Sequence, residues 1–143
     1  GDILKGVAAV ALVPGWLSAP LHEPLAGGAA ALGAVLGHTY SPFTGFRGGK
    51  GVATGFGVFA LLMPGPAGWA AVVFLAAAGA TKYVSLGSIL AALTVPLTGY
   101  FMGYRPETVA VSAAITALVI WRHKDNIGRL IRGEENRFGS KDN

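Results

Sequence analysis

The sequence predicts an all-α polytopic integral membrane protein, and composition and charge placement support that fold class. Of 143 residues, 52% are hydrophobic and 13% are charged, whereas a soluble domain carries roughly 25% charged residues. Too few charges remain to cover the surface of a small soluble helical domain. Asp, Glu, Lys and Arg are also absent from long stretches of the chain, namely 6–22, 24–46, 51–81, 83–104 and 108–121. Because a helix needs about 20 mostly apolar residues to cross a bilayer, these stretches predict a bundle of about six transmembrane helices.

Proline, glycine and charge breaks set the limits of the six apolar segments. The first follows Lys5, and the second is rich in alanine and glycine, which allow close helix packing in lipid. The break at Met63-Pro64-Gly65-Pro66 separates the third from the fourth, because proline cannot continue a helix from the preceding turn. The fifth follows the charge at Lys82, and the sixth follows Arg105. The predicted segments are 6–20, 24–38, 52–63, 66–81, 86–103 and 107–121.

One predicted segment, 52–63, is short. Its helix would be roughly 18 Å long, against about 30 Å for the hydrocarbon core. We therefore expect either a half-span or a helix that tilts beside a thinned site.

The placement of positive charge predicts the orientation. With six spans both chain ends lie on one side, and ten of the eleven Lys and Arg residues then share that side, the exception being Arg105. Loops rich in lysine and arginine stay in the cytoplasm. We expect residues 1–123 to form the transmembrane domain, with a cytoplasmic Gly-rich loop at 38–54. Residues 124–143 would form a basic cytoplasmic C-terminal tail.

Some chemistries are disfavoured from the start. Without cysteine there is no disulfide, thiolate zinc site or cysteine nucleophile. His38 and His123 lack a third ligand with suitable spacing, so we expect no metal and no cofactor. The sequence has no Gly-x-Ser-x-Gly elbow, which disfavours a serine acyl-enzyme.

The run Gly48-Gly49-Lys50-Gly51 leads directly into segment 52–63 and is typical of an anion site. Glycines let backbone N–H groups approach a ligand, and the helix start adds unpaired N–H groups and a positive dipole end. Lys50 adds a full charge, and the hydroxyl of Thr54 lies one turn into the helix. The run is not a Walker loop, because Gly51 follows the lysine. The alternative is a flexible turn with a snorkelling lysine.

The sequence after the last span suggests a second polar cluster. On a helix, His123 and Asn126 share a face, and Arg129 lies on a neighbouring stripe. His38, at the end of the second segment, faces the same side and is a candidate base near neutral pH. The alternatives are a basic collar that anchors the last span and a histidine that caps a helix C-terminus.

A short turn between two spans carries one cation and several hydroxyls. Lys82 and Ser85 belong to this turn, Thr81 to Ser88, on the predicted cytoplasmic side. The turn either lines the same site or is only a helix connection with an anchoring lysine.

These motifs together resemble a known family, the bacterial acyl-phosphate:glycerol-3-phosphate acyltransferases (PlsY family). The pieces occur in family order over nearly the whole chain. They are Gly1-Asp2-x-x-Lys5-Gly6, Gly37-His38-x-x-Ser41-Pro42-Phe43, Phe46-Arg47-Gly48-Gly49-Lys50-Gly51-Val52-Ala53-Thr54, Thr81-Lys82-Tyr83-Val84-Ser85-Leu86-x-Ser88 and Arg122-His123-x-x-Asn126-Ile127-x-Arg129-Leu130-x-x-Gly133-x-Glu135.

The resemblance implies transfer of a fatty acyl group from acyl phosphate to the 1-hydroxyl of glycerol 3-phosphate, giving lysophosphatidic acid and phosphate. It implies a multi-pass enzyme of the bacterial inner membrane, without metal or nucleic acid, whose active-site loops face the cytoplasm. The residues expected in catalysis are His38, Lys50, His123 and Asn126. The base is expected to be His38, His123 or the substrate's own phosphate, and the sequence does not choose among them. Those expected to bind substrate phosphate are Arg47, Gly48, Gly49, Gly51, Thr54, Lys82, Ser85, Arg129 and Glu135.

Two expectations qualify this interpretation. Members of the family have seven spans, and this chain starts after the position of their N-terminal helix and first motif. Lys82 stands where the family usually has arginine, which keeps the charge.

Two other functions compete with this interpretation. One is an anion transporter or channel, since a broken half-span with a lysine at its start suits a substrate pathway. The other is a structural subunit of a membrane complex.

Overall fold

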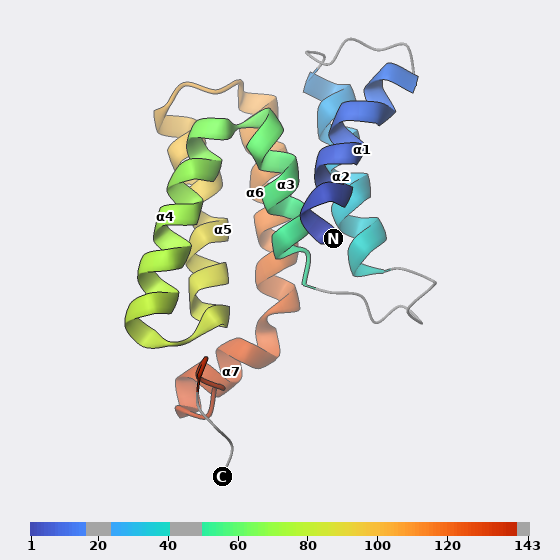
Figure 1. The fold of residues 1–143 in the computed structure, drawn as a ribbon. Coiled ribbons are helices and arrows are strands. Elements are labelled where there is room, and N and C mark those ends of the chain that lie inside the picture. The colour runs from blue at the N-terminus through green and yellow to red at the C-terminus, as the bar shows by residue number, and fades with distance from the viewer. Residues whose placement is uncertain (17–23, 41–49, 140–143) are drawn as a thin grey trace.

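The computed structural model describes residues 1–16, 24–40 and 50–139, with side chains described outside 13–26, and the described residues are helical without any strand. Seven helices follow one another along the chain (Figure 1). They are α1 Asp2–Trp16, α2 Pro24–Thr39, α3 Val52–Leu62, α4 Pro64–Thr81, α5 Val84–Phe101, α6 Pro106–Arg122 and α7 Lys124–Arg132.

The short helix α3 occupies the middle of the bundle. Each of α1, α2, α4, α5 and α6 packs against it, and α4 and α5 form an antiparallel hairpin on one side. The core is formed by small and medium apolar side chains, among them Val58 and Phe59 of α3 and Ile115 and Val119 of α6. Helix α3 is therefore held between the five longer helices.

The predicted break between the third and fourth segments is confirmed. Helix α3 ends at Leu62 and α4 begins at Pro64, with Met63 between them in a non-helical backbone conformation. Proline is tolerated in the first turn of a helix, since its missing N–H would have no intrahelical partner there. Both α4 and α6 start on a proline, so these helices begin one or two residues before the predicted limits.

Helices α1 and α3 touch through glycines. A Cβ atom at Gly6 would overlap the carbonyl oxygen of Thr54, and one at Gly57 would overlap the carbonyl oxygen of Ile3. Because the obstructing atoms belong to the backbone, neither overlap can be relieved by a side-chain rotation. Small residues that bring helix backbones together are the usual means of packing helices in lipid.

The outward face of the α4–α5 hairpin is apolar. Trp69, Val72 and Leu75 of α4 recur at helical spacing and are exposed, as are Leu97 and Phe101 of α5. Of the described helices, α4 and α5 are both long and apolar enough to cross a membrane, each with 18 residues. The other helices are shorter, so helix length alone does not establish six spans.

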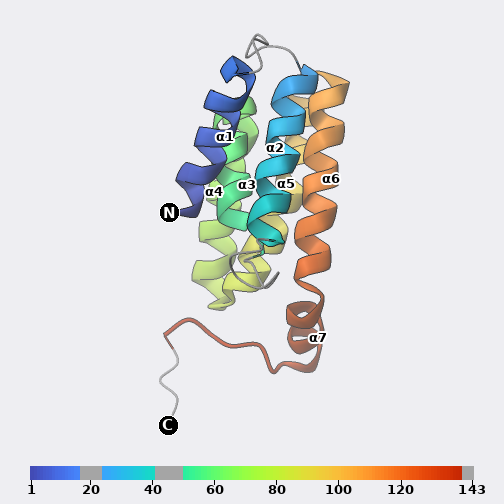
Figure 2. The same cartoon turned by 90° about the vertical axis from the view of Figure 1, so that its right-hand side faces the viewer.

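Helix α7 turns away from α6 at the lower end of the bundle (Figure 2). The chain after α7 then runs back beneath the bundle. The expected tail 124–143 thus begins with a helix that ends at Gly133, whose φ of 70° favours glycine. Of the expected Gly-rich loop 38–54, residues 38 and 39 belong to α2 and residues 52–54 to α3, and 41–49 fall outside the described residues.

Candidate active site

Lys50 lies immediately before α3, and its ammonium group points toward α7. Gly51 caps α3 with a φ of 78°, a conformation that glycine adopts without strain. A Cβ at Gly51 would also lie 3.0 Å from Cγ1 of Val35. With the backbone turned in this way, Lys50 Nζ donates a hydrogen bond of 2.5 Å to Oδ1 of Asn126.

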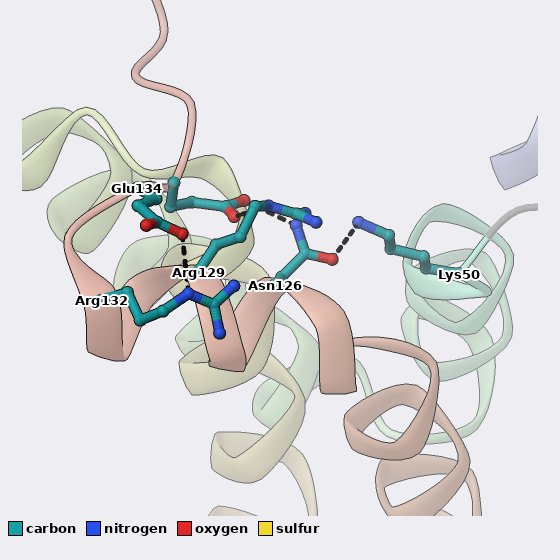
Figure 3. A network of polar contacts seen from close by, with 6 residues as sticks. Lys50, Asn126, Arg129, Arg132 and Glu134 are labelled. Carbon is teal, nitrogen blue, oxygen red and sulfur yellow. Dashed lines mark hydrogen bonds and ion pairs between the residues drawn. The ribbon is translucent and has the colours of Figure 1, made fainter.

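Asn126 connects the lysine to a buried carboxylate (Figure 3). Its Nδ2 donates to Oε1 of Glu135 at 2.6 Å, and Nε of Arg129 donates to Oε2 at 2.7 Å. The ammonium group has only donors and the carboxylate only acceptors, so the amide can face them in just one orientation. The side chain of Glu135 is 6% exposed. The network therefore fixes both Lys50 and the amide that holds it.

His123 joins α6 to α7 and is 2% exposed. Its Nδ1 lies 2.8 Å from the carbonyl oxygen of Val119. Since a carbonyl only accepts, Nδ1 must carry the proton, and Nε2 of the neutral ring then has a free lone pair. Burial lowers the pKa of His123 below 6.5, a shift that the charge of Lys50 reinforces and the Val119 carbonyl opposes. The ring is a neutral acceptor at pH 7.

A polar cavity of about 380 Å³ collects these groups. Lys50, Ser85, His123, Asn126 and Glu135 line it. The other lining residues come from the starts of α3 and α5 and from the C-terminal segment; they are Val52, Val84, Ser88, Asn136, Arg137 and Phe138.

The C-terminal segment is fastened to the α4–α5 turn beside this cavity. The Phe138 N–H donates to the carbonyl of Lys82 at 2.7 Å. The guanidinium of Arg137 donates to the hydroxyl of Tyr83 at 3.2 Å and lies 5.3 Å from the centre of its ring. Lys82 has a φ of 66°, which is uncommon for a residue other than glycine. That conformation ends α4 and supports the turn.

The electrostatics of the cavity favour an anion. Desolvation lowers the pKa of Lys50, while the carboxylate of Glu135 opposes that shift. Burial acts to raise the pKa of Glu135, but hydrogen bonds from Asn126 and Arg129 outweigh it and hold the pKa below 4.5. Ser85 Oγ also contributes to this lowering, although it meets the geometry of no hydrogen bond among the described residues. The carboxylate of Glu135 already accepts hydrogen bonds from Asn126 and Arg129. The ammonium group of Lys50 has three donors and uses one of them on Asn126, so two remain for an anionic ligand.

A second, apolar cavity of about 520 Å³ adjoins the polar one. It runs between α3, α4, α5 and α6, and its walls include small side chains such as Ala67, Ala70 and Ala91. Val52, Val84 and Ser88 line both cavities. The polar site therefore opens into a groove of hydrocarbon character.

The sequence profile of the family described as glycerol-3-phosphate acyltransferase matches residues 1–133. The chain belongs to this family. It is 44% identical over 138 residues to the glycerol-3-phosphate acyltransferase of Endomicrobium trichonymphae, with 96% of this chain and 67% of the relative covered. It is likewise 44% identical over 148 residues to that of Shouchella clausii, covering 98% and 69%. The chain thus spans about two thirds of the length of these relatives.

Solved structures agree with the family assignment. A crystal structure of PlsY (YgiH), an integral membrane glycerol 3-phosphate acyltransferase in its glycerol 3-phosphate form, superposes with a TM-score of 0.86. The two share 38% sequence identity, over 96% of this chain and 68% of that one. The crystal structure of the same PlsY in its lysophosphatidic acid form superposes with a TM-score of 0.85. The predicted resemblance is confirmed, and this acyltransferase has the fold of an integral membrane protein.

The acyltransferase site gathers many of the predicted residues from distant segments. Lys50, Ser85, His123, Asn126 and Glu135 line the polar cavity, and Arg129 braces it through Glu135. Gly51 lines the apolar groove and caps α3. The predictions for Arg47, Gly48 and Gly49 fall outside the described residues.

Three predicted residues of the acyltransferase site lie apart from the cavity lining. His38 Nδ1 lies 3.6 Å from Oδ1 of Asp2, between α1 and α2. Thr54 is fully buried within α3, and its hydroxyl has no partner among the described residues. Lys82 meets the C-terminal segment through its carbonyl. Their predicted functional roles stay predictions.

Sequence reasoning did not single out Asn136, Arg137 and Phe138, which line the cavity of this acyltransferase. They belong to the predicted basic tail, and no local pattern pairs Arg137 with Tyr83, 54 positions earlier. The one usable signal was the position of Glu135 at the end of the last motif.

Proposed function

We propose that this chain transfers a fatty acyl group from acyl phosphate to the 1-hydroxyl of glycerol 3-phosphate. The observation that carries the proposal is the junction of the cation-lined cavity with the apolar groove at Val52, Val84 and Ser88. An acyl phosphate has the same two halves, an anionic head and a hydrocarbon tail. Family membership favours this reaction over an anion transporter or channel.

The length of the groove suits a lipid tail. From Val84 to Val95, the lining residues of α5 extend over roughly 16 Å of helix. That is about half of the ~30 Å hydrocarbon core, which is the depth of one leaflet. An acyl chain as long as those of the membrane lipids would therefore lie in the groove.

The reaction needs no protein nucleophile, because acyl phosphate is already activated. The hydroxyl oxygen of glycerol 3-phosphate attacks the acyl carbon, and the bond from that carbon to the phosphate oxygen breaks. The phosphate leaves with the electron pair, and the hydroxyl proton passes to a base. Lys50 would neutralise charge on the leaving phosphate, and the fixed network would position both anions.

His123 is the base that we propose among the described residues. Its Nε2 lone pair is available because Nδ1 donates to Val119, and its lowered pKa keeps the ring neutral. His38, predicted as another candidate, is occupied near Asp2 and does not line the cavity. Asn126 and Glu135 would orient Lys50 rather than transfer protons.

We further propose six spans with the polar cavity at the cytoplasmic face of the bacterial inner membrane. The exposed apolar face of α4 and α5 supports burial in lipid, and the basic residues near α7 support a cytoplasmic position for that end. The hydroxyls of Thr94 and Thr98 bond to carbonyls of their own helix, as polar groups inside a membrane must.

The test is phosphate release in detergent from acyl phosphate and glycerol 3-phosphate, with lysophosphatidic acid identified as the second product. Release should require both substrates, because the glycerol hydroxyl is the attacking group. Phosphate release without glycerol 3-phosphate, at the same rate, would show hydrolysis instead of transfer.

A further inference from the structure

The apolar groove has a far end, opposite the polar cavity. Its last lining residues are Phe59 of α3, Ala67 of α4, Val95 of α5 and Ile115 of α6. Phe59 lies one turn before the end of α3 and Ala67 one turn after the start of α4, so these two residues flank the turn between α3 and α4. On the function proposed above, the methyl end of the acyl chain reaches this point.

Beside these residues, the same buried core contains one flexible side chain, that of Met63. Met63 lies between α3 and α4, four positions after Phe59, and Gly99 of α5 follows Val95 by four and so shares its helix face. Met63 is fully buried. A Cβ at Gly99 would overlap Cε of Met63 and would lie 3.6 Å from Cγ2 of Val109 and 3.9 Å from Cγ of Pro66. The thioether therefore occupies the space that the missing side chain of Gly99 leaves.

We propose that Met63, seated on Gly99, is the floor of the acyl groove and sets the longest acyl chain that the enzyme accepts. This inference rests on the proposed acyl transfer. A methionine is unbranched and adapts its shape to a gap, so it fills the end of the groove without a polar group. It packs within a buried cluster of apolar residues.

The floor has a measurable consequence for substrate choice. Each methylene that enters an apolar site favours binding by about fourfold. A methylene that reaches the floor gains nothing, because it must displace Met63 or bend the chain within a packed core. Preference should therefore rise with chain length up to the floor and fall beyond it.

The experiment is a competition between saturated acyl phosphates that differ in length by two methylenes, in one reaction with glycerol 3-phosphate. The ratio of the two products depends on relative kcat/KM and is independent of the fraction of enzyme that is folded. Met63→Ala should raise the ratio of the longer to the shorter product by about fourfold for each added methylene that it admits. Met63→Val is a milder second variant, because valine leaves a smaller space than alanine.

Two further variants complete the test. Ala67→Leu narrows the groove at its last lining position and should lower the same ratio. Ala76→Leu, at an exposed position of the same helix outside the groove, should leave it unchanged. If Ala67→Leu shifts the ratio and neither Met63 variant does, the groove holds the acyl chain but Met63 is not its floor, and the inference fails. If the unaltered enzyme forms no lysophosphatidic acid at all, the proposed function fails instead.

Discussion

Lys50 and Asn126 are 76 positions apart in the chain and are joined by a hydrogen bond of 2.5 Å from Nζ to Oδ1. The first residue precedes the central helix α3, and the second belongs to α7 below the bundle. The bond therefore links the Gly-rich motif to the last motif of the sequence. It also holds the ammonium group of Lys50 in the polar cavity beside the apolar groove. The proposed acyl phosphate substrate has an anionic head and a hydrocarbon tail that match these two cavities.

Replacement of that cation should abolish turnover. Lys50→Ala removes the charge proposed to neutralise the leaving phosphate, and loss of one such electrostatic group typically lowers kcat by about 10²–10³. The matched control is Lys5→Ala, since Lys5 is exposed and bonds to Asp2 on its own helix. Phosphate release and thermal unfolding in detergent should be measured for both. Near-normal turnover in Lys50→Ala would rule out its role.

Two adjacent glutamates allow a comparison of the network with the surface. Glu135→Gln removes a buried charge that accepts from Asn126 and Arg129, and hydrogen bonds to charged groups contribute about 1.5–3 kcal/mol each. We expect kcat to fall at least about tenfold, because Lys50 loses its fixed position. Glu134 is exposed and pairs only with Arg132 among the described residues, so Glu134→Gln should change stability by no more than about 0.5 kcal/mol. Both kcat and thermal unfolding should be measured for the two variants. Equal losses of kcat in Glu135→Gln and Glu134→Gln would contradict the proposed network.

The rate should depend on pH through His123. Burial places its folded-state pKa below 6.5, so the base stays neutral in the free enzyme as the pH falls through 6.5, and kcat/KM declines only at lower pH. The stability of the fold follows the same direction. Between the folded pKa and 6.5 the unfolded chain binds more protons, so the stability contributed by His123 is complete above 6.5 and is lost as the pH falls through that window. A kcat/KM profile with an inflection above 6.5 would exclude His123 as the base.

Removal of the His123 ring separates its role from that of other titrating groups. His123→Gln should lose most turnover and also the acidic limb of the pH profile. His38→Gln, which alters a histidine outside the cavity lining, should keep that limb. Retention of the limb in His123→Gln would assign it to another group.

The close contact between α1 and α3 should be sensitive to a single methyl group. Gly57→Ala places a Cβ on the carbonyl oxygen of Ile3, and we expect a loss of about 1–3 kcal/mol of stability from overpacking. Gly33→Ala is the control, because Gly33 lies in α2 with nothing near its Cβ position. There the substitution should stabilise the helix by about 0.5–1 kcal/mol. Thermal unfolding in detergent compares the two, and equal midpoints would mean that the helices separate easily.

Local signals in the sequence predicted the helices well. Hydropathy, charge gaps and proline placed six apolar segments within two residues of their observed limits at most ends, and the Met63–Pro64 break was correct. The exception was α1, which starts at Asp2 and not at residue 6. Its early start packs Ile3 against Gly57 of α3, a tertiary contact that composition does not encode.

The grouping of the site was only partly visible in the sequence. The shared polarity of the motifs predicted a pocket that includes Lys50, His123 and Asn126, and these residues do lie together. The same polarity also placed His38 there, whereas it lies near Asp2. Which cations meet depends on how the helices pack, and no pattern along the chain records that.

By itself the sequence determined the class of the protein, its family and the order of its helices, because hydropathy and short motifs are properties of neighbouring residues. The tertiary structure alone decided that α3 lies at the centre, that Asn126 faces Lys50, and that the polar cavity and the apolar groove share lining residues at Val52, Val84 and Ser88. The physical reason is that these relationships arise where backbones approach across glycine and alanine faces, between segments that are far apart in the chain.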